Sequence, residues 1–222
     1  MTGLVSRWQV KVLVEVMANI LHIDSSPRGD RSKSRQLAKE FIVAWKVQHP
    51  DDVITYRDLR QTPVPHVTED WIAADFTPLE ALTPEMAELL KFSDELVDEF
   101  LAADRCVFSV PMYNFSIPSN FKAYIDQVVR VGRTFTFEEG QFKGLANGRK
   151  VLFITSRGVE YGVGSPYEGW DCQEPALRYA FQFIGVTDIQ FIHASGLDMG
   201  DEAQERGLDE ARSKIQALVG SW

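Results

Sequence analysis

The chain has 222 residues, of which 45% are hydrophobic and 25% are charged. These proportions are those of an ordinary globular protein, so general disorder is excluded, and the length suits one large domain. The formal net charge of −9 disfavours general binding to nucleic acids or anionic membranes. No stretch reaches the ~20 apolar residues that a membrane span requires. The two cysteines, Cys106 and Cys172, form no disulfide framework or metal-ligand pattern, which predicts a reducing compartment, the cytoplasm.

The first half of the chain alternates short apolar runs with helical patterns. Residues 1–16 have no place in this alternation, so we expect them to be an extension ahead of a single domain of residues 17–222. Residues 59–84 hold four prolines and little periodicity, which predicts a long loop that is functional or interfacial. The expected strands are 19–24 and 53–56, and the expected helices are 34–48 and 84–101.

The second half continues the same alternation. Ser119 or Asn120 is expected to cap a helix that runs to about residue 130 and has its apolar residues at helical spacing. The remaining expected elements are strands at 105–110, 150–156 and 189–193, with helices at 175–184 and 202–219.

Short, continuously apolar strands that are each followed by a helix predict an α/β fold with a parallel sheet covered on both faces. Five such strands suit the doubly wound, flavodoxin-like order 2-1-3-4-5. Ligands of such sheets bind outside the carboxyl ends of the strands, near the point where the strand order reverses. The loops after the first, third and fourth strands are therefore the expected site.

The first of these loops, residues 24–34, is rich in hydroxyl groups and opens a helix. Ser26, Ser32, Lys33 and Ser34 could bind a phosphate there, because the free N–H groups and the dipole of a helix start favour an anion. A simpler interpretation is that Ser32 or Ser34 only caps the helix. The loop lacks the glycine pattern of a P-loop and of a dinucleotide-binding turn.

The other two loops have different compositions. Residues 111–118 are apolar and aromatic, which suits the flat face of an aromatic ligand, although a loop covered by its own helix would look the same. Residues 156–164 contain three glycines, which allow close approach of the backbone, although turns without a ligand also use glycine.

The sequence from about residue 18 onward resembles the FMN-dependent NADH-azoreductases, which are flavodoxin-like NAD(P)H:quinone oxidoreductases. The motifs that carry the resemblance are Ser-Ser followed by Ser-x-Ser, Pro-Met-Tyr-Asn-Phe-Ser-Ile-Pro, Thr-Ser-Arg-Gly and Phe-Ile-Gly-Val-Thr-Asp. The family usually has a second glycine where this chain has Val159.

The resemblance implies FMN as cofactor and NADH or NADPH as electron donor. It places the FMN phosphate at Ser26, Ser32, Lys33 and Ser34. It places the ribityl chain and the flavin ring at Met112, Tyr113, Asn114 and Phe115, and the pyrimidine edge of the ring at Ser156, Arg157, Gly158 and Val159.

The resemblance also implies a reaction in which the flavin carries the chemistry by two-electron, ping-pong hydride transfer to a quinone or azo compound, so no catalytic side chain is expected. It implies a homodimer, for which the helix 119–130 and the segment 135–137 are candidate interface or pocket-wall elements, although core packing explains the apolar face of the helix better. A flavodoxin-type electron carrier without direct NADH oxidation is the alternative. A hydrolase or phosphotransfer domain on the same fold is less favoured, because no nucleophile constellation is visible.

Overall fold

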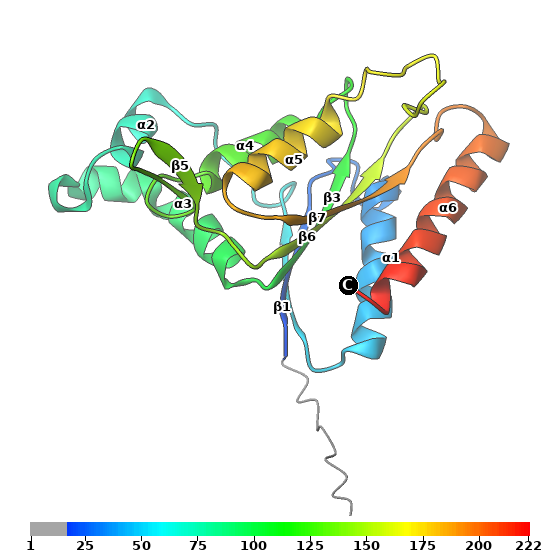
Figure 1. The fold of residues 1–222 in the computed structure, drawn as a ribbon, viewed down its shortest axis with the longest axis horizontal. Coiled ribbons are helices and arrows are strands. Elements are labelled where there is room, and N and C mark those ends of the chain that lie inside the picture. The colour runs from blue at the N-terminus through cyan, green and yellow to red at the C-terminus, as the bar shows by residue number, and fades with distance from the viewer. Residues whose placement is uncertain (1–16) are drawn as a thin grey trace, which may run out of the picture.

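The computed structural model describes residues 17–222, so the expected extension of residues 1–16 lies outside the described part of the chain. A five-stranded parallel sheet in the order β2-β1-β3-β6-β7 forms the centre of the molecule (Figure 1). When only the strands of this sheet are numbered, the order is the predicted 2-1-3-4-5. The strands are β1 (Asn19–Asp24), β2 (Val53–Asp58), β3 (Arg105–Pro111), β6 (Lys150–Ser156) and β7 (Asp188–Ala194).

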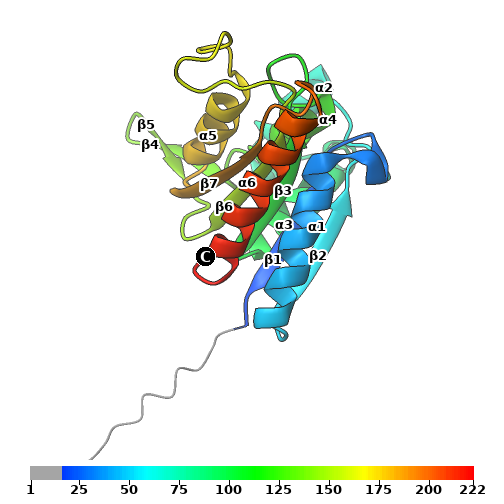
Figure 2. The same cartoon turned by 90° about the vertical axis from the view of Figure 1, so that its right-hand side faces the viewer.

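Helices cover both faces of the sheet, as Figures 1 and 2 show from two sides. One layer holds α1 (Lys33–Gln48) and α6 (Asp201–Val219), and the other holds α3 (Pro84–Ala102), α4 (Ser119–Val128) and α5 (Gln173–Phe183). Within the described residues, no helix combines the length and the apolar character that crossing a membrane requires.

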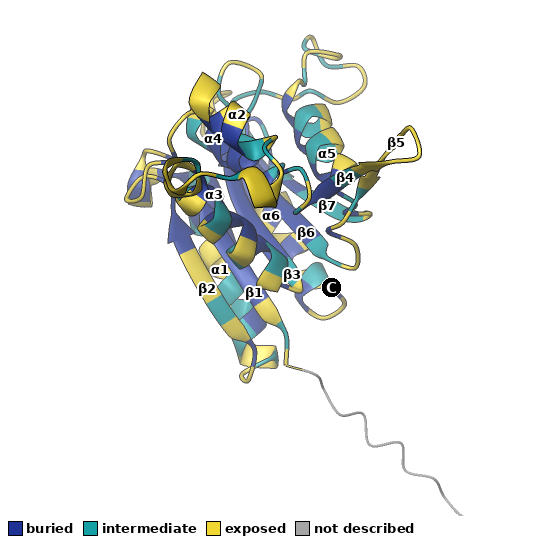
Figure 3. Cartoon of the chain, turned by 90° about the vertical axis from the view of Figure 1, so that its left-hand side faces the viewer, coloured by how far each residue is buried: buried dark blue, intermediate teal, exposed yellow. Residues whose placement is uncertain are grey.

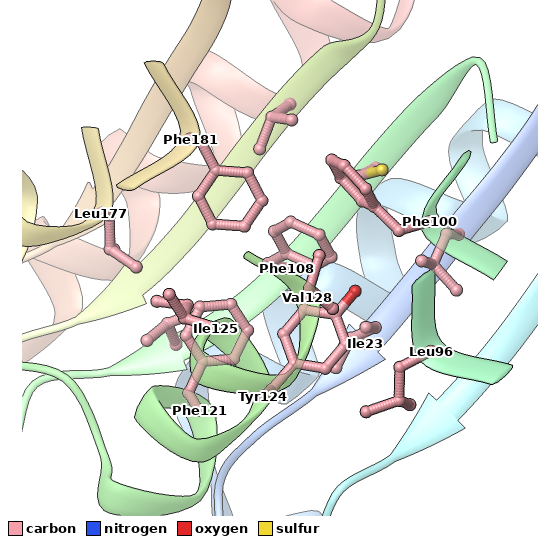
Figure 4. Close-up of a cluster of buried hydrophobic side chains, with 14 of the residues drawn as sticks. Ile23, Leu96, Phe100, Phe108, Phe121, Tyr124, Ile125, Val128, Leu177 and Phe181 are labelled. Carbon is pink, nitrogen blue, oxygen red and sulfur yellow. The ribbon is translucent and has the colours of Figure 1, made fainter. Parts of the chain in front are cut away.

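Nearly every residue of the central strands β3 and β6 is buried, and Figure 3 colours the centre of the sheet largely as buried. Helices cover both faces, which explains why these strands are continuously apolar. Ile20 belongs to the cluster under α1 and α6, whereas its neighbour Leu21 belongs to the cluster under α3, α4 and α5. Figure 4 shows Phe108 of β3 in the second cluster, near Phe121 of α4 and Phe181 of α5. The ring centroids of Phe108 and Phe181 are 5.4 Å apart.

The expected long loop at 59–84 contains the short helix α2 (Glu69–Asp75) and a 3₁₀ turn at Leu79–Ala81, so that prediction was wrong in part. The Thr68 side chain caps α2 by accepting a hydrogen bond from the backbone N–H of Trp71 at 3.2 Å. Trp71 and Ala74 are buried against Leu90 of α3. Tertiary packing therefore stabilises a helix that is too short to show a clear periodicity in the sequence.

A two-stranded antiparallel hairpin, β4 (Phe135–Glu138) and β5 (Gln141–Gly144), was not predicted. Glu139 and Gly140 form its turn, and both have positive φ angles, +52° and +79°. Two successive positive φ angles are typical of the type I′ turn that joins two-residue hairpins.

The expected cap of α4 was also wrong. Pro118 occupies the N-cap position, and Ser119 and Asn120 lie inside the helix. The Asn120 side chain instead donates a hydrogen bond to the carbonyl oxygen of Ser25 at 2.7 Å. Asn120 therefore ties the start of α4 to the loop after β1.

Candidate functional site

The carboxyl ends of the parallel strands meet at one edge of the sheet, the upper edge in Figure 1. Backbone and side-chain hydrogen bonds connect the loops there. The Ser25 hydroxyl donates to the Ser109 carbonyl at 2.8 Å, and the Met112 N–H donates to the Ser156 carbonyl at 2.9 Å. The loops after β1, β3 and β6, which are separate in sequence, are therefore held side by side.

These loops surround a pocket of about 240 Å³. Eight of the twelve predicted site residues line it: Ser26, Ser32, Lys33, Met112, Tyr113, Ser156, Arg157 and Gly158. The rest of the lining, which the sequence analysis did not select, is Arg28, Arg31, Pro111, Leu197, Asp198 and Gln204.

The first loop brings hydroxyl groups and positive charge to the start of α1. The Ser32 hydroxyl accepts a hydrogen bond from the Arg35 backbone N–H at 3.5 Å, so Ser32 is the N-cap of α1. The hydroxyl oxygen of Ser34 lies 3.2 Å from that of Ser32, and both residues are buried. Lys33 adds a positive charge in a chain that is otherwise acidic. A helix start with hydroxyls and a cation is a favourable place for a phosphate group.

The second loop has an unusual backbone. Asn114 and Phe115 adopt positive φ angles of +49° and +66°, which are rare for residues other than glycine. The Cys172 N–H donates to the Phe115 carbonyl at 3.0 Å, and the ring centroids of Phe115 and Trp170 are 5.3 Å apart. Strained backbone of this kind persists where surrounding contacts hold it, and it gathers at functional sites.

The third loop carries a buried arginine. The Arg157 Nε donates to Gln173 Oε1 at 3.3 Å, and Nη2 lies 3.0 Å from Asp171 Oδ2. That ionic contact lacks hydrogen-bond geometry, so Nη2 is a buried donor without a hydrogen-bond partner. Burial lowers the pKa of Arg157, although guanidinium groups remain charged in proteins.

A pair of polar side chains lies behind Arg157 and fastens the start of α5 to the sheet. The His193 ring bonds through Nδ1 to the Thr155 hydroxyl (2.8 Å) and through Nε2 to the Glu174 carboxylate (2.9 Å). Burial lowers the pKa of His193. The bond from His193 is the main cause that lowers the pKa of Glu174 to about 2.

Four predicted residues do not line the pocket. Ser34 lies behind Ser32, while Asn114, Phe115 and Val159 follow the lining residues of their loops. Val159 does not adopt a positive φ angle, so the backbone at this position accommodates a β-branched residue.

The loop after β7 forms part of the pocket wall and lies close to Gly158. A Cβ on Gly158 would lie 2.4 Å from Oδ2 of Asp198, so the absence of a side chain is required for close approach rather than for a positive φ. Leu197 and Asp198 were missed because their residue types carry no ligand pattern. Their place after the fifth strand was the available signal.

A larger cavity of about 550 Å³ lies between α1 and β2. Its wall holds the apolar residues Ile42, Val43 and Ile54 beside a polar majority that includes Asp24, Arg35 and Tyr56, and the loops after β3 and β6 do not contribute to it. We therefore place the candidate site in the smaller pocket, where the strand ends converge.

Comparison with known proteins shows the family of the chain. A family model described as the flavodoxin-like fold matches residues 18–219. An FMN-dependent NADH:quinone oxidoreductase from Nostoc punctiforme is 59% identical over 206 residues, which cover 93% of this chain and 100% of that protein. A protein of the same name from Pseudomonas putida is 43% identical and covers 91% of this chain and 100% of its own.

Two solved structures are similar. The azoreductase from Bacillus anthracis str. Sterne has a TM-score of 0.86 at 24% identity, covering 93% of this chain and 100% of its own, and this likeness concerns the fold. An FMN-dependent NADH-azoreductase from Bacillus anthracis str. Ames Ancestor in complex with FMN has a TM-score of 0.78 at 26% identity, covering 91% of this chain and 100% of its own. The resemblance inferred from the sequence motifs is confirmed: the chain belongs to the FMN-dependent NADH:quinone oxidoreductase family of flavodoxin-like proteins.

Proposed function

We propose that this protein is an FMN-dependent oxidoreductase that transfers electrons from NADH, or NADPH, to quinones and azo compounds. The observation that carries the proposal is the pocket at the strand ends. Residues of the first loop that could donate hydrogen bonds to a phosphate line it together with Ser156, Arg157 and Gly158 of the third loop. The printed names of the relatives support the same cofactor, donor and acceptor.

The residues of the pocket fit FMN. The hydroxyls of Ser26 and Ser32, with Lys33 and the start of α1, would bind the phosphate. Ser34, predicted for the same role, would support the Ser32 hydroxyl from behind. Nη2 of Arg157 also fits, because its ionic contact with Asp171 lacks hydrogen-bond geometry and a ligand carbonyl could accept from this buried nitrogen. The predicted roles of the remaining residues are part of the same proposal: Met112, Tyr113, Asn114 and Phe115 at the ribityl chain and ring, and Ser156, Gly158 and Val159 at the pyrimidine edge.

Bound FMN would accept a hydride from the nicotinamide and deliver two electrons to the acceptor. The protein then has to bind the cofactor, orient the donor and the acceptor against it, and stabilise the charge of the reduced ring. The Arg157 backbone N–H already donates to the Ala194 carbonyl at 2.8 Å. The backbone N–H groups of Gly158 and Val159 would stabilise negative charge on the pyrimidine edge, which is an electrostatic role. The donor and the acceptor would use one face in turn, and this gives ping-pong kinetics. No side chain is assigned a catalytic role, and Cys106 is fully buried with a pKa raised by burial.

We propose that the functional unit is a homodimer. A pocket of about 240 Å³ is smaller than the ~300–1,000 Å³ of most small-molecule sites, so a second chain is expected to complete it. The hairpin and α5 expose Phe137, Phe142 and Phe183, which pack on one another with ring centroids 4.9 and 5.4 Å apart. A contiguous exposed aromatic surface is typical of an interface. The helix 119–130 is less suited, because most of the apolar residues of α4 are already buried in the core.

We propose the cytoplasm as the location. Both cysteines are free, Cys106 in the core and Cys172 at the surface, which suits a reducing compartment. A reducing compartment also contains the nicotinamide donor.

Steady-state kinetics test the proposed function. NADH oxidation should depend on added benzoquinone, and double-reciprocal plots at several fixed quinone concentrations should be parallel. Intersecting lines would indicate that donor and acceptor are bound together, and would contradict the proposal that they occupy one face in turn. A flavin-containing protein that does not oxidise NADH directly would favour the alternative of an electron carrier.

A further inference from the structure

A buried arginine lies directly behind the first loop. Arg35 is 8% exposed, and its guanidinium donates to both carboxylate oxygens of Asp58, at 2.8 and 2.9 Å. This is a bidentate pair between α1 and the end of β2, and such pairs are geometrically specific as well as strong.

The same guanidinium reaches the first loop and the end of β1. Nη2 donates to the backbone carbonyl of Ser26 at 3.1 Å, and Nη1 lies 3.1 Å from Asp24 Oδ2. Asp24 in turn accepts hydrogen bonds from the hydroxyls of Ser109 and Tyr56. Arg35 therefore connects the ends of β1, β2 and β3 beneath the residue that is proposed to face the phosphate.

The charges of Arg35, Asp24 and Asp58 affect how strongly an anion binds in the neighbouring pocket. The pKa values of Asp24 and Asp58 are both lowered from the usual value, although burial opposes the shift in each. The main lowering cause is the His22 ring, 3.3 Å away, for Asp24, and the hydrogen bonds from Arg35 for Asp58. Both carboxylates are thus ionised at neutral pH. Without Arg35, two buried negative charges would lie behind the Ser26 loop and would repel a phosphate dianion.

The carbonyl contact has a separate effect. A backbone carbonyl that points into an anion site repels the anion, whereas one that accepts from a buried guanidinium behind the loop is directed away from it. The bond to the Ser26 carbonyl thus selects the loop conformation that leaves hydroxyl and N–H donors for the pocket.

We propose that Arg35 is a positioning residue for the phosphate end of the cofactor: it fixes the Ser26 backbone and offsets one of the two negative charges that Asp24 and Asp58 place behind it. This inference rests on the proposed FMN site. It concerns the phosphate alone, so it predicts different effects on FMN and on riboflavin, which lacks the phosphate.

Arg57 provides a matched control. It precedes Asp58 in β2, is 9% exposed, and donates through Nε and Nη2 to the two carboxylate oxygens of Glu99 at 2.8 and 2.6 Å. It pairs with α3, on the opposite face of the sheet from Arg35, and does not line the pocket. Replacement of Arg57 should affect folding stability without a specific effect on the phosphate.

The experiment compares dissociation constants of FMN and riboflavin, measured by flavin fluorescence on the full-length protein stripped of flavin. Arg35→Lys keeps one positive charge but cannot make the bidentate pair with Asp58 and the bond to the Ser26 carbonyl together. It should weaken FMN binding about tenfold, and riboflavin binding less than about threefold. Arg57→Lys should lower the melting temperature and leave the ratio of the two constants at the wild-type value.

If Arg35→Lys does not fold, Tyr56→Phe tests the same cluster. The Tyr56 hydroxyl accepts from Arg35 and donates to Asp24, and its half-exposed ring would remain. It should change the ratio in the same direction by a smaller factor. If the variants weaken the binding of FMN and of riboflavin equally, the positioning role of Arg35 is overturned, while the proposed FMN site is not affected. Wild-type protein that binds neither ligand would instead overturn the proposed function.

Discussion

Gly158 and Asp198 approach so closely that a Cβ atom on the glycine would lie 2.4 Å from Oδ2 of the aspartate. The backbone of the same two residues is joined, because the Asp198 N–H donates to the Gly158 carbonyl at 2.9 Å. The loops after β6 and β7 therefore form one wall of the pocket, and any side chain at 158 must displace the exposed Asp198 carboxylate.

Gly158→Ala is expected to weaken FMN binding about tenfold and to change the melting temperature of the flavin-free protein little, because a flexible, exposed carboxylate can move. Fluorescence titration and thermal melts measure the two effects. Gly162→Ala is the matched control in the same loop, since a Cβ there meets nothing within 4 Å. Similar losses of affinity in both variants would contradict this explanation.

Substitutions of Ser32 and Ser34 distinguish helix capping from phosphate binding. Ser32→Ala should destabilise the flavin-free and the FMN-loaded protein alike by ~1 kcal/mol or less, because the cap bond to Arg35 is long, and should also weaken FMN. Ser34 is not the cap and lies behind Ser32, so Ser34→Ala should weaken FMN binding by ~0.5–1.5 kcal/mol through the lost bond to Ser32, with little effect on the flavin-free protein. Thermal melts with and without FMN give both quantities. An unchanged dissociation constant in both variants would return these serines to a purely structural role.

The sheet could be predicted because its information is local. Each central strand is a continuous apolar run, and the alternation with helices fixes the order and the edge where ligands bind. The roles of the twelve predicted site residues stay predictions, although the structure brings eight of them to one pocket.

The missed features depend on contacts that are distant in sequence. Helix α2 needs Leu90 of α3 to bury Trp71. Arg35 has the appearance of an ordinary helix residue until Asp58, 23 positions later, is placed beside it. No pattern within a short window contains such information.

The Glu174–His193 pair predicts a pH dependence of folding stability. The folded pKa of Glu174, about 2, is below the usual 4.5, so its contribution is complete above pH 4.5 and is lost as the pH falls from 4.5 toward 2. Glu174→Gln should therefore lower the free energy of unfolding by about 2 kcal/mol at pH 5 and by less at pH 3, after allowance for partial exposure.

Urea unfolding at pH 5 and pH 3 measures this difference. Glu88→Gln is the control, because that carboxylate is exposed on α3 and, among residues 17–222, forms an ion pair with Lys91 alone. A difference between wild type and Glu174→Gln that is constant over the same range would contradict the assigned role of the pair.

The exposed aromatic surface predicts the effect of one substitution on assembly. Phe142 is 63% exposed and lies between Phe137 and Phe183. Phe142→Ser should shift the protein from dimer toward monomer and weaken FMN binding, because the second chain is proposed to complete the pocket. Sedimentation velocity measures the assembly.

Val47→Ser is the control for this prediction, because Val47 is 78% exposed on α1 and outside that surface. A wild-type monomer at micromolar concentration, or a Phe142→Ser variant that remains fully dimeric, would argue against this interface.

The visible spectrum of the purified protein, recorded before and after addition of NADH without air, tests the central claim most directly. The account predicts a yellow protein whose oxidised-flavin absorption bleaches with NADH and returns with benzoquinone, and whose heat-released cofactor is FMN rather than FAD. A colourless protein that takes up no added FMN, or a bound flavin that NADH does not bleach, would contradict it.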